Sequence, residues 1–114
     1  APWLQDDKII NAALFIQEGV IQHIIPKHML PNYGVFDEKR VYNSGEMLKP
    51  IPFKSLKLGV MICEDMWFPQ SAQYLKAHGA DILIVLNGSP FDLTKHERRL
   101  SQARERVRET SLPL

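Results

Sequence analysis

The strongest constraint on the fold is a strand–helix–strand pattern in the second half of the chain. Residues 56–62 begin by alternating apolar and polar side chains and then become apolar on both faces, and residues 81–87 contain a second apolar run, from Ile82 to Leu86. Apolar residues on both faces are typical of a strand in the covered interior of a sheet. Between the two runs, Pro69 is suited to begin a helix that His78 and Gly79 would end. We therefore expect two parallel, neighbouring strands joined by a right-handed crossover helix.

The first half of the chain predicts a β-hairpin. Residues 8–16 and 20–26 are two apolar, β-branched runs separated by a short link that contains Gly19, a pattern typical of two antiparallel strands. Residues 27–54 are rich in Pro and Gly and predict a long irregular segment, with at most one helical turn at 37–40.

The end of the chain predicts a helix over residues 94–109, with Thr94 as its cap. Its helical spacing puts Leu100, Ala103 and Val107 on one face, which we expect to be the buried one. No repeat and no composition shift divides the chain, so the order of elements predicts one α/β domain.

Charge and cysteine content exclude several classes of protein. Fourteen Lys and Arg residues against thirteen Asp and Glu give a net charge of +1, too little for a general attraction to nucleic acid or anionic membranes. No apolar run is long enough to span a membrane. The single cysteine cannot form an internal disulfide, which favours a cytoplasmic protein. The few His and Cys residues show no metal-ligand spacing, so no metal site is expected.

Cys63 is the first candidate for chemistry. It directly follows the apolar run at 56–62, which places it at the carboxyl edge of the expected sheet, where open α/β folds bind their ligands. A residue between a strand and a helix resembles the nucleophile elbow of hydrolases, whose backbone N–H groups can stabilise an oxyanion. The alternative is a small buried apolar residue, the commonest role of a single cysteine.

Lys27 is the second candidate, because it directly follows the apolar run at 20–26. An ammonium near a thiol favours the thiolate and can stabilise a negative tetrahedral oxygen. The alternative is an ordinary surface lysine. Glu64 and Asp65 follow Cys63 and could orient it, although a carboxylate touching the sulfur opposes thiolate formation unless it acts as the base.

Two long motifs occur in order along the chain, PKHMLPNYGVFDEKR over residues 26–40 and LGVMICEDMWFP over residues 58–69. Together with the Asn87-Gly88-Ser89-Pro90-Phe91 turn and the helix that follows it, they resemble the nitrilase (carbon–nitrogen hydrolase) superfamily. More narrowly, the string LPNYGVFDEKRVY over residues 30–42 is similar to the glutaminase domain of glutamine-dependent NAD synthetases.

The resemblance implies a fold and a mechanism. The family fold is an α/β, nitrilase-like α-β-β-α sandwich, and its catalytic set is Glu, Lys and Cys. By motif match, Cys63 takes the role of the nucleophile, and Lys27 stabilises the oxyanion together with the backbone N–H after Cys63. The thiolate would attack the glutamine side-chain amide, release ammonia and leave a γ-glutamyl thioester for water to hydrolyse. The residues expected to contact the substrate are Glu64, Asp65, Trp67, Asn87 and Ser89.

The sequence also lacks parts of the family pattern. No residue matches the glutamate base, and the synthetase domain, which would use ATP and Mg, is absent. We therefore expect residues 1–114 to be a partial glutaminase domain, without its N-terminal and C-terminal parts and without a cofactor of its own. Its expected partners are glutamine, the synthetase domain of the same parent chain and further copies in a homo-oligomer, with no nucleic acid or membrane. Alone, it should hydrolyse glutamine poorly.

Two alternatives stay open at this point. The same Cys63 and Lys27 could serve another nitrilase-type amidase that acts on a different amide. The chain could also be a non-catalytic fragment with a role in packing or assembly, in which Cys63 is inert.

Overall fold

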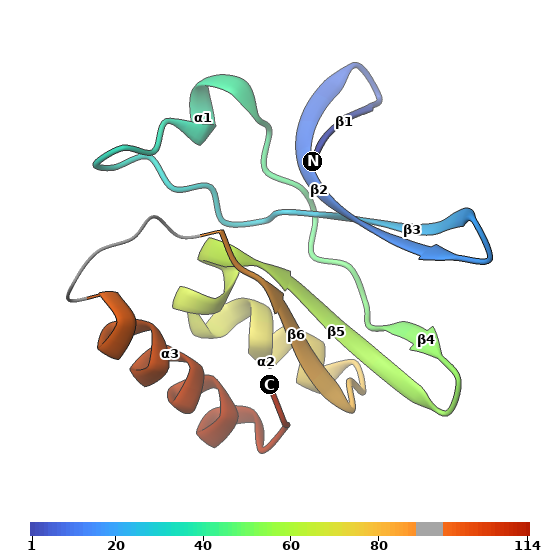
Figure 1. Cartoon of the computed structure of the whole chain (residues 1–114), viewed down its shortest axis with the longest axis vertical. Helices are drawn as coiled ribbons and strands as arrows, with labels where there is room; N and C mark the ends of the chain where they lie inside the picture. The colour runs from blue at the N-terminus through green and yellow to red at the C-terminus, as the bar shows by residue number, and fades with distance from the viewer. Residues whose placement is uncertain (89–94) are drawn as a thin grey trace. The chain divides into compact units, whose positions relative to one another are not determined.

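The computed structural model describes residues 1–88 and 95–114 of the chain. The chain divides into two compact units, Ala1–Leu48 and Lys49–Leu114. Figure 1 shows the elements of both units. Mixed strands and helices confirm the expected α/β class.

The first unit contains an antiparallel sheet in the order β1-β2-β3. Strands β2 (Lys8–Gln17) and β3 (Val20–Pro26) form the predicted hairpin. Glu18 and Gly19 turn the chain with φ angles of 52° and 76°, as a type I′ turn requires of both central residues. Positive φ at the glutamate is strained, and the ordered sheet on both sides of the turn holds it there.

Strand β1 (Pro2–Gln5) was not predicted from the sequence. It pairs with β2 through a second tight turn, in which Asp6 and Asp7 have φ angles of 49° and 60°. Neither turn residue is glycine, and the strand has only 4 residues. For both reasons the sequence did not predict this second hairpin, although Asp is among the non-glycine residues that best tolerate a positive φ.

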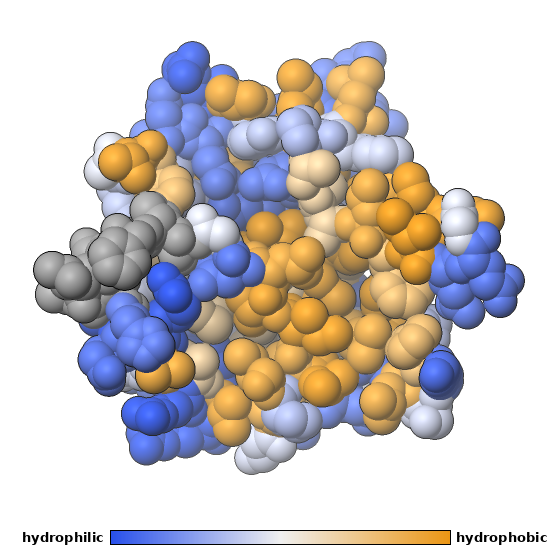
Figure 2. Space-filling view, viewed as in Figure 1, coloured by the Kyte–Doolittle hydropathy of each residue, from blue (hydrophilic) through white to orange (hydrophobic). Residues whose placement is uncertain are grey.

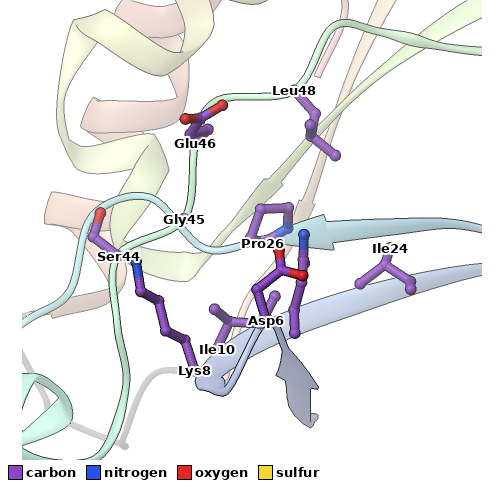
Figure 3. A pocket seen from close by; sticks show the side chains of 10 residues that line it. Asp6, Lys8, Ile10, Ile24, Pro26, Ser44, Gly45, Glu46 and Leu48 are labelled. Carbon is purple, nitrogen blue, oxygen red and sulfur yellow. The ribbon is translucent and has the colours of Figure 1, made fainter.

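The segment after β3 folds back against the end of that strand. Its one helix, α1 (Glu38–Val41), is the single turn that the sequence predicts. Further on, the Gly45 N–H donates to the Lys27 carbonyl oxygen at 3.0 Å. A Cβ on Gly45 would lie 2.1 Å from the Cβ of Pro26, and Figure 3 shows the two residues side by side. Only glycine allows this close approach.

The second unit contains a mixed sheet in the order β4-β5-β6. Strand β5 (Leu56–Ile62) is parallel to β6 (Ile82–Leu86), with Leu58 opposite Ile82 and Ile62 opposite Leu86. The predicted parallel pair is therefore confirmed. Strand β4 (Ile51–Phe53) pairs antiparallel with β5. It was missed because it has 3 residues with a central proline, a residue confined to sheet edges.

Helix α2 (Pro69–Ala77) joins the parallel strands, with proline at its start as predicted. Its end is a Schellman motif, in which the Gly79 N–H donates to the Lys76 carbonyl and the Ala80 N–H donates to the Leu75 carbonyl, each at 3.0 Å. Gly79 has a φ of 85°, which confirms the expected stop.

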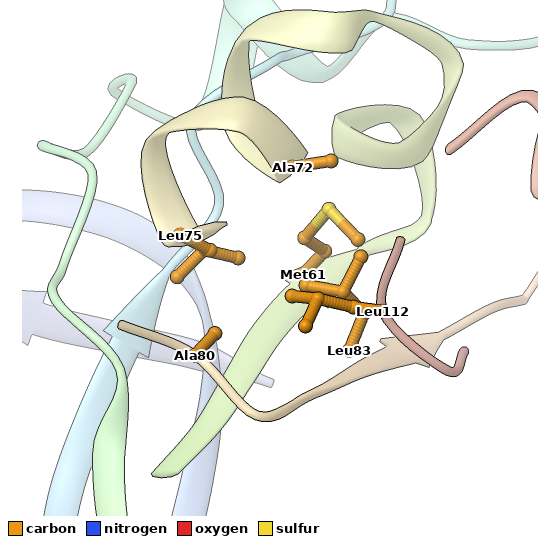
Figure 4. Close-up of a cluster of buried hydrophobic side chains, with 6 residues drawn as sticks. All are labelled: Met61, Ala72, Leu75, Ala80, Leu83 and Leu112. Atoms are coloured by element: carbon orange, nitrogen blue, oxygen red, sulfur yellow. The ribbon is translucent and has the colours of Figure 1, made fainter. Parts of the chain in front are cut away.

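The core of the second unit lies between its sheet and α2. Figure 4 shows the six buried side chains that form it, Met61, Ala72, Leu75, Ala80, Leu83 and Leu112. Side chains alternate along a strand, so the opposite face of the sheet carries other apolar residues, including the exposed Leu56, Ile84 and Leu86. Figure 2 shows apolar residues gathered over β5 and β6. The sheet is thus apolar on both faces, as its sequence predicts.

Helix α3 (Lys95–Thr110) confirms the predicted terminal helix, but the prediction of its buried face was partly wrong. Leu100 and Val107 are each 37% exposed, whereas Arg106 and Thr110 are 3% and 2% exposed. An arginine is buried here because it finds polar partners, which hydrophobic periodicity cannot reveal. The expected cap, Thr94, lies outside the described residues.

Among the described residues, every helix is too short or too polar to cross a membrane.

Gly45→Ala tests the close approach of the 44–46 segment to β3. The added Cβ would overlap the rigid Pro26 ring, so we expect a loss of about 1–3 kcal/mol of unfolding free energy, measured by urea denaturation. Gly88→Ala is the matched control, because a Cβ there meets no atom within 4 Å among the described residues. Equal stability of the two variants would contradict the packing.

Candidate active site

Lys27 is fixed through both its backbone and its side chain. Its N–H donates to the Asn11 carbonyl in β2 at 2.7 Å, and its carbonyl accepts the Gly45 N–H. The residue is 1% exposed. The alternative of an ordinary surface lysine is therefore wrong.

The Lys27 ammonium is held by Glu38, the first residue of α1. Its Nζ lies 2.7 Å from Oε1 and 2.8 Å from Oε2 of that carboxylate. The start of α1 is closed by a hydrogen bond from the Glu38 N–H to the Pro31 carbonyl, at 3.2 Å. Both carboxylate oxygens thus face one buried cation, which fixes where the positive charge lies.

Glu38 was not singled out by the sequence reasoning. It stands in a run of charged residues, where a solvated helical turn is the ordinary interpretation. The motif over residues 30–42, which contains Glu38, was the signal that could have found it. Its role follows from the structure, which joins two side chains that lie 11 residues apart.

Cys63 occupies a strained turn at the carboxyl end of β5. It is the first residue of the short 3₁₀ helix η1 (Cys63–Trp67), and its φ is 47°. For a non-glycine residue this left-handed conformation costs about 1–3 kcal/mol, and such strain clusters at functional sites. The side chain is neither fully buried nor fully exposed. These features fit the expected elbow better than a buried apolar residue.

The acidic residues after Cys63 are buried in η1. Glu64 and Asp65 are 6% and 4% exposed. The Ile62 N–H donates to Oδ2 of Asp65 at 3.0 Å, so this carboxylate closes the turn that carries the cysteine. Trp67 is half-buried at the end of η1. Substrate contacts by Glu64, Asp65 and Trp67 stay predictions.

The other expected substrate contacts follow β6. Asn87 is exposed and comes directly after the strand. Because β5 and β6 are parallel, Asn87 and Cys63 leave the sheet at the same edge. Ser89 lies outside the described residues. A short distance between Lys27 and Cys63 also stays a prediction.

The first unit contains a pocket of about 320 Å³, shown in Figure 3. Its lining residues include none of those predicted for the site; they are Gln5, Asp6, Lys8, Ile10, Ile24, Pro26, Ser44, Gly45, Glu46 and Leu48. Within the described ranges, the structure brings no three His, Cys, Asp or Glu side chains together as a metal-binding group.

Glu38→Ala tests the buried ion pair. Removing the carboxylate leaves the Lys27 ammonium buried without its counterion, which typically costs about 3–5 kcal/mol of unfolding free energy. Urea denaturation should show this loss, with a smaller one for Glu38→Gln, which keeps an acceptor oxygen. The control Glu46→Ala alters an exposed carboxylate and should change stability by less than about 0.5 kcal/mol. Equal effects of Glu38→Ala and Glu46→Ala would show that the pair contributes nothing.

Comparison of the sequence with known proteins gives one family. The carbon-nitrogen hydrolase profile matches residues 1–107. The chain is 38% identical over 113 residues to a glutamine-dependent NAD(+) synthetase of Rhodobacter capsulatus, covering 99% of this chain and 20% of that protein.

Solved structures give the same result. A glutamine-dependent NAD+ synthetase from Acinetobacter baumannii superposes with a TM-score of 0.90 at 33% identity, over 97% of this chain and 21% of that one. Saccharomyces cerevisiae Nit3, a member of branch 10 of the nitrilase superfamily, superposes with a TM-score of 0.77 at 29% identity, over 97% of this chain and 40% of that one.

The chain therefore spans about a fifth of the length of the NAD synthetases that it matches. Its fold is that of the nitrilase superfamily, as the motifs predict, and it corresponds to part of the domain. The chain belongs to the carbon-nitrogen hydrolase family.

Proposed function

We propose that these residues are part of the glutamine amidohydrolase domain of a glutamine-dependent NAD synthetase, which supplies ammonia for NAD synthesis. The observation that carries the proposal is the strained φ of 47° at Cys63, at the carboxyl end of a central strand. The choice of glutamine as substrate is supported by similarity to NAD synthetases along nearly the whole chain.

Cys63 is the nucleophile in the proposed reaction. Its thiolate attacks the side-chain amide carbon of glutamine, and a carbon–sulfur bond forms as the carbonyl oxygen becomes negative. The tetrahedral intermediate then collapses, the carbon–nitrogen bond breaks, and a proton passes to the nitrogen, which leaves as ammonia. Water hydrolyses the γ-glutamyl thioester, which releases glutamate and returns the thiol.

Lys27 stabilises the negative oxygen with the backbone N–H that follows Cys63. A cation fixed before the reaction is most effective, because no reorganisation is needed when charge develops. Glu38 supplies this fixation through its contacts to the Lys27 ammonium. The residues proposed to contact glutamine are Glu64, Asp65, Trp67, Asn87 and Ser89.

The complete reaction needs parts beyond these residues. By resemblance to the family, a glutamate takes the proton of the thiol, and the complete protein provides it. The proposed partner is a synthetase domain in the same parent chain, which consumes the ammonia with ATP and Mg. The glutaminase domain itself uses no cofactor. The complete protein is proposed to be a cytoplasmic homo-oligomer.

Cys63→Ala in the complete protein tests the proposal. We expect glutamine-dependent NAD formation and ammonia release from glutamine to fall to background, because the thioester cannot form. NAD formation from added ammonium salt should persist, since the synthetase domain does not need the thiol. Glutamine hydrolysis that survives Cys63→Ala would contradict the role of Cys63, and preferential hydrolysis of simple aliphatic amides would contradict glutamine as substrate.

The chain of 114 residues alone should be a poor glutaminase. Losing general-base assistance typically costs 10²–10⁴-fold, and we expect a decrease of about this size relative to the complete protein. Ammonia release by the purified chain measures it, with Cys63→Ala as background. Turnover equal to that of the complete protein would show that these residues contain their own base.

A further inference from the structure

Arg106 is a buried cation on α3 that the proposed reaction does not use. It is 3% exposed, although arginine is rarely fully buried without partners. Its Nη2 lies 2.7 Å from Oε1 of Glu109 and 3.7 Å from Oε2 of Glu105. Glu109 thus supplies the negative charge that a buried guanidinium requires.

The second terminal nitrogen of the guanidinium, Nη1, contacts the turn that carries Cys63. It donates to the backbone carbonyl oxygen of Met66 at 3.4 Å, across 40 residues of sequence. Met66 belongs to η1, three residues after the cysteine, and is 3% exposed. A carbonyl near the end of a short helix has no later turn to bond to, so an outside donor must satisfy it.

This arrangement is poorly explained by stability alone. The Nε of Arg106 is buried without a hydrogen-bond partner among the described residues. A buried ion pair with an unsatisfied donor is often no more stabilising than apolar side chains of the same volume. An apolar residue could fill the space, but it could not hold a backbone carbonyl in one position.

The strained backbone of Cys63 requires a restraint of this kind. A residue held at a φ of 47° keeps that conformation only if its surroundings fix it. The Asp65 carboxylate binds the backbone N–H of Ile62, directly before the cysteine. Arg106 binds the carbonyl oxygen of Met66, on the other side of it. The two contacts therefore hold the turn from both sides of Cys63.

We propose that Arg106 is a positioning residue, which orients the Cys63 thiol by holding η1 from α3, with Glu109 as its counterion. The inference rests on the proposed role of Cys63 as nucleophile. Loss of the restraint should lower the rate of attack on bound glutamine and leave glutamine binding nearly unchanged.

Arg106→Lys in the complete protein is the central test. Lysine keeps the positive charge for Glu109 but lacks the planar fork that reaches two partners. Misplacement of a reacting group by about 1 Å can cost 10²-fold, so we expect the glutaminase kcat to fall by about 10- to 100-fold. KM for glutamine should change by less than about twofold, because the restraint acts on the attack by Cys63 and not on the binding of glutamine. Alkylation of Cys63 by iodoacetamide should change in rate as well.

Arg104→Lys is the matched control, because Arg104 is exposed on the same helix. It should leave the glutaminase kcat and the alkylation rate unchanged. NAD formation from ammonium salt should be normal in both variants, which would show that the synthetase domain is intact, and an unchanged KM for glutamine would show that the glutaminase domain is folded. An unchanged kcat in folded Arg106→Lys would overturn the inference.

Glu109→Gln covers the case in which Arg106→Lys does not fold. The amide oxygen still accepts a hydrogen bond from Arg106 but no longer balances its charge, so we expect a smaller fall in kcat with the same KM. An unchanged kcat in this variant would also overturn the inference. Failure of the proposed function is distinguishable, because it requires glutamine hydrolysis to survive Cys63→Ala.

Discussion

The buried ion pair between Lys27 and Glu38 is the constraint on which the first unit depends. A lysine that is 1% exposed is tolerated because both oxygens of one carboxylate lie within 2.8 Å of its ammonium. Several local features position Lys27 and Glu38 for this contact. The hairpin ends where Lys27 begins, α1 presents Glu38, and Gly45 allows the chain to pass close to the lysine backbone. The unit thus fixes a positive charge at one position.

The second unit holds Cys63 in a strained backbone conformation. The parallel pair of β5 and β6 and the core beneath α2 provide a rigid base for the turn. Buried polar contacts then act on both sides of Cys63, from Asp65 and from Arg106. A preorganised cation and a preorganised thiol are two of the components that acyl transfer through a thioester uses, and the proposed reaction adds a glutamate base.

Sequence patterns predicted the parallel strands and α2 because both-face apolarity, an initial proline and a final glycine are local signals. The position of Cys63 after a strand was predictable for the same reason. The sequence did not predict that Lys27 is buried against Glu38 or that Arg106 is buried. Each of these features depends on a contact between residues that lie 11 or 40 positions apart in the chain. Apolar spacing in α3 pointed instead to Leu100 and Val107, because a hydrophobic pattern cannot show where a charged side chain finds a buried partner.

The central claim is that Cys63 forms a thioester with glutamine and that Lys27 stabilises the oxygen as it forms. Rapid mixing of the complete protein with glutamine, acid quenching and peptide mass spectrometry tests it most directly. The account predicts a γ-glutamyl group on the peptide that contains Cys63, formed much more slowly in Lys27→Met. Glutamine hydrolysis without this adduct, with the adduct on another residue, or at the same rate in Lys27→Met would contradict it.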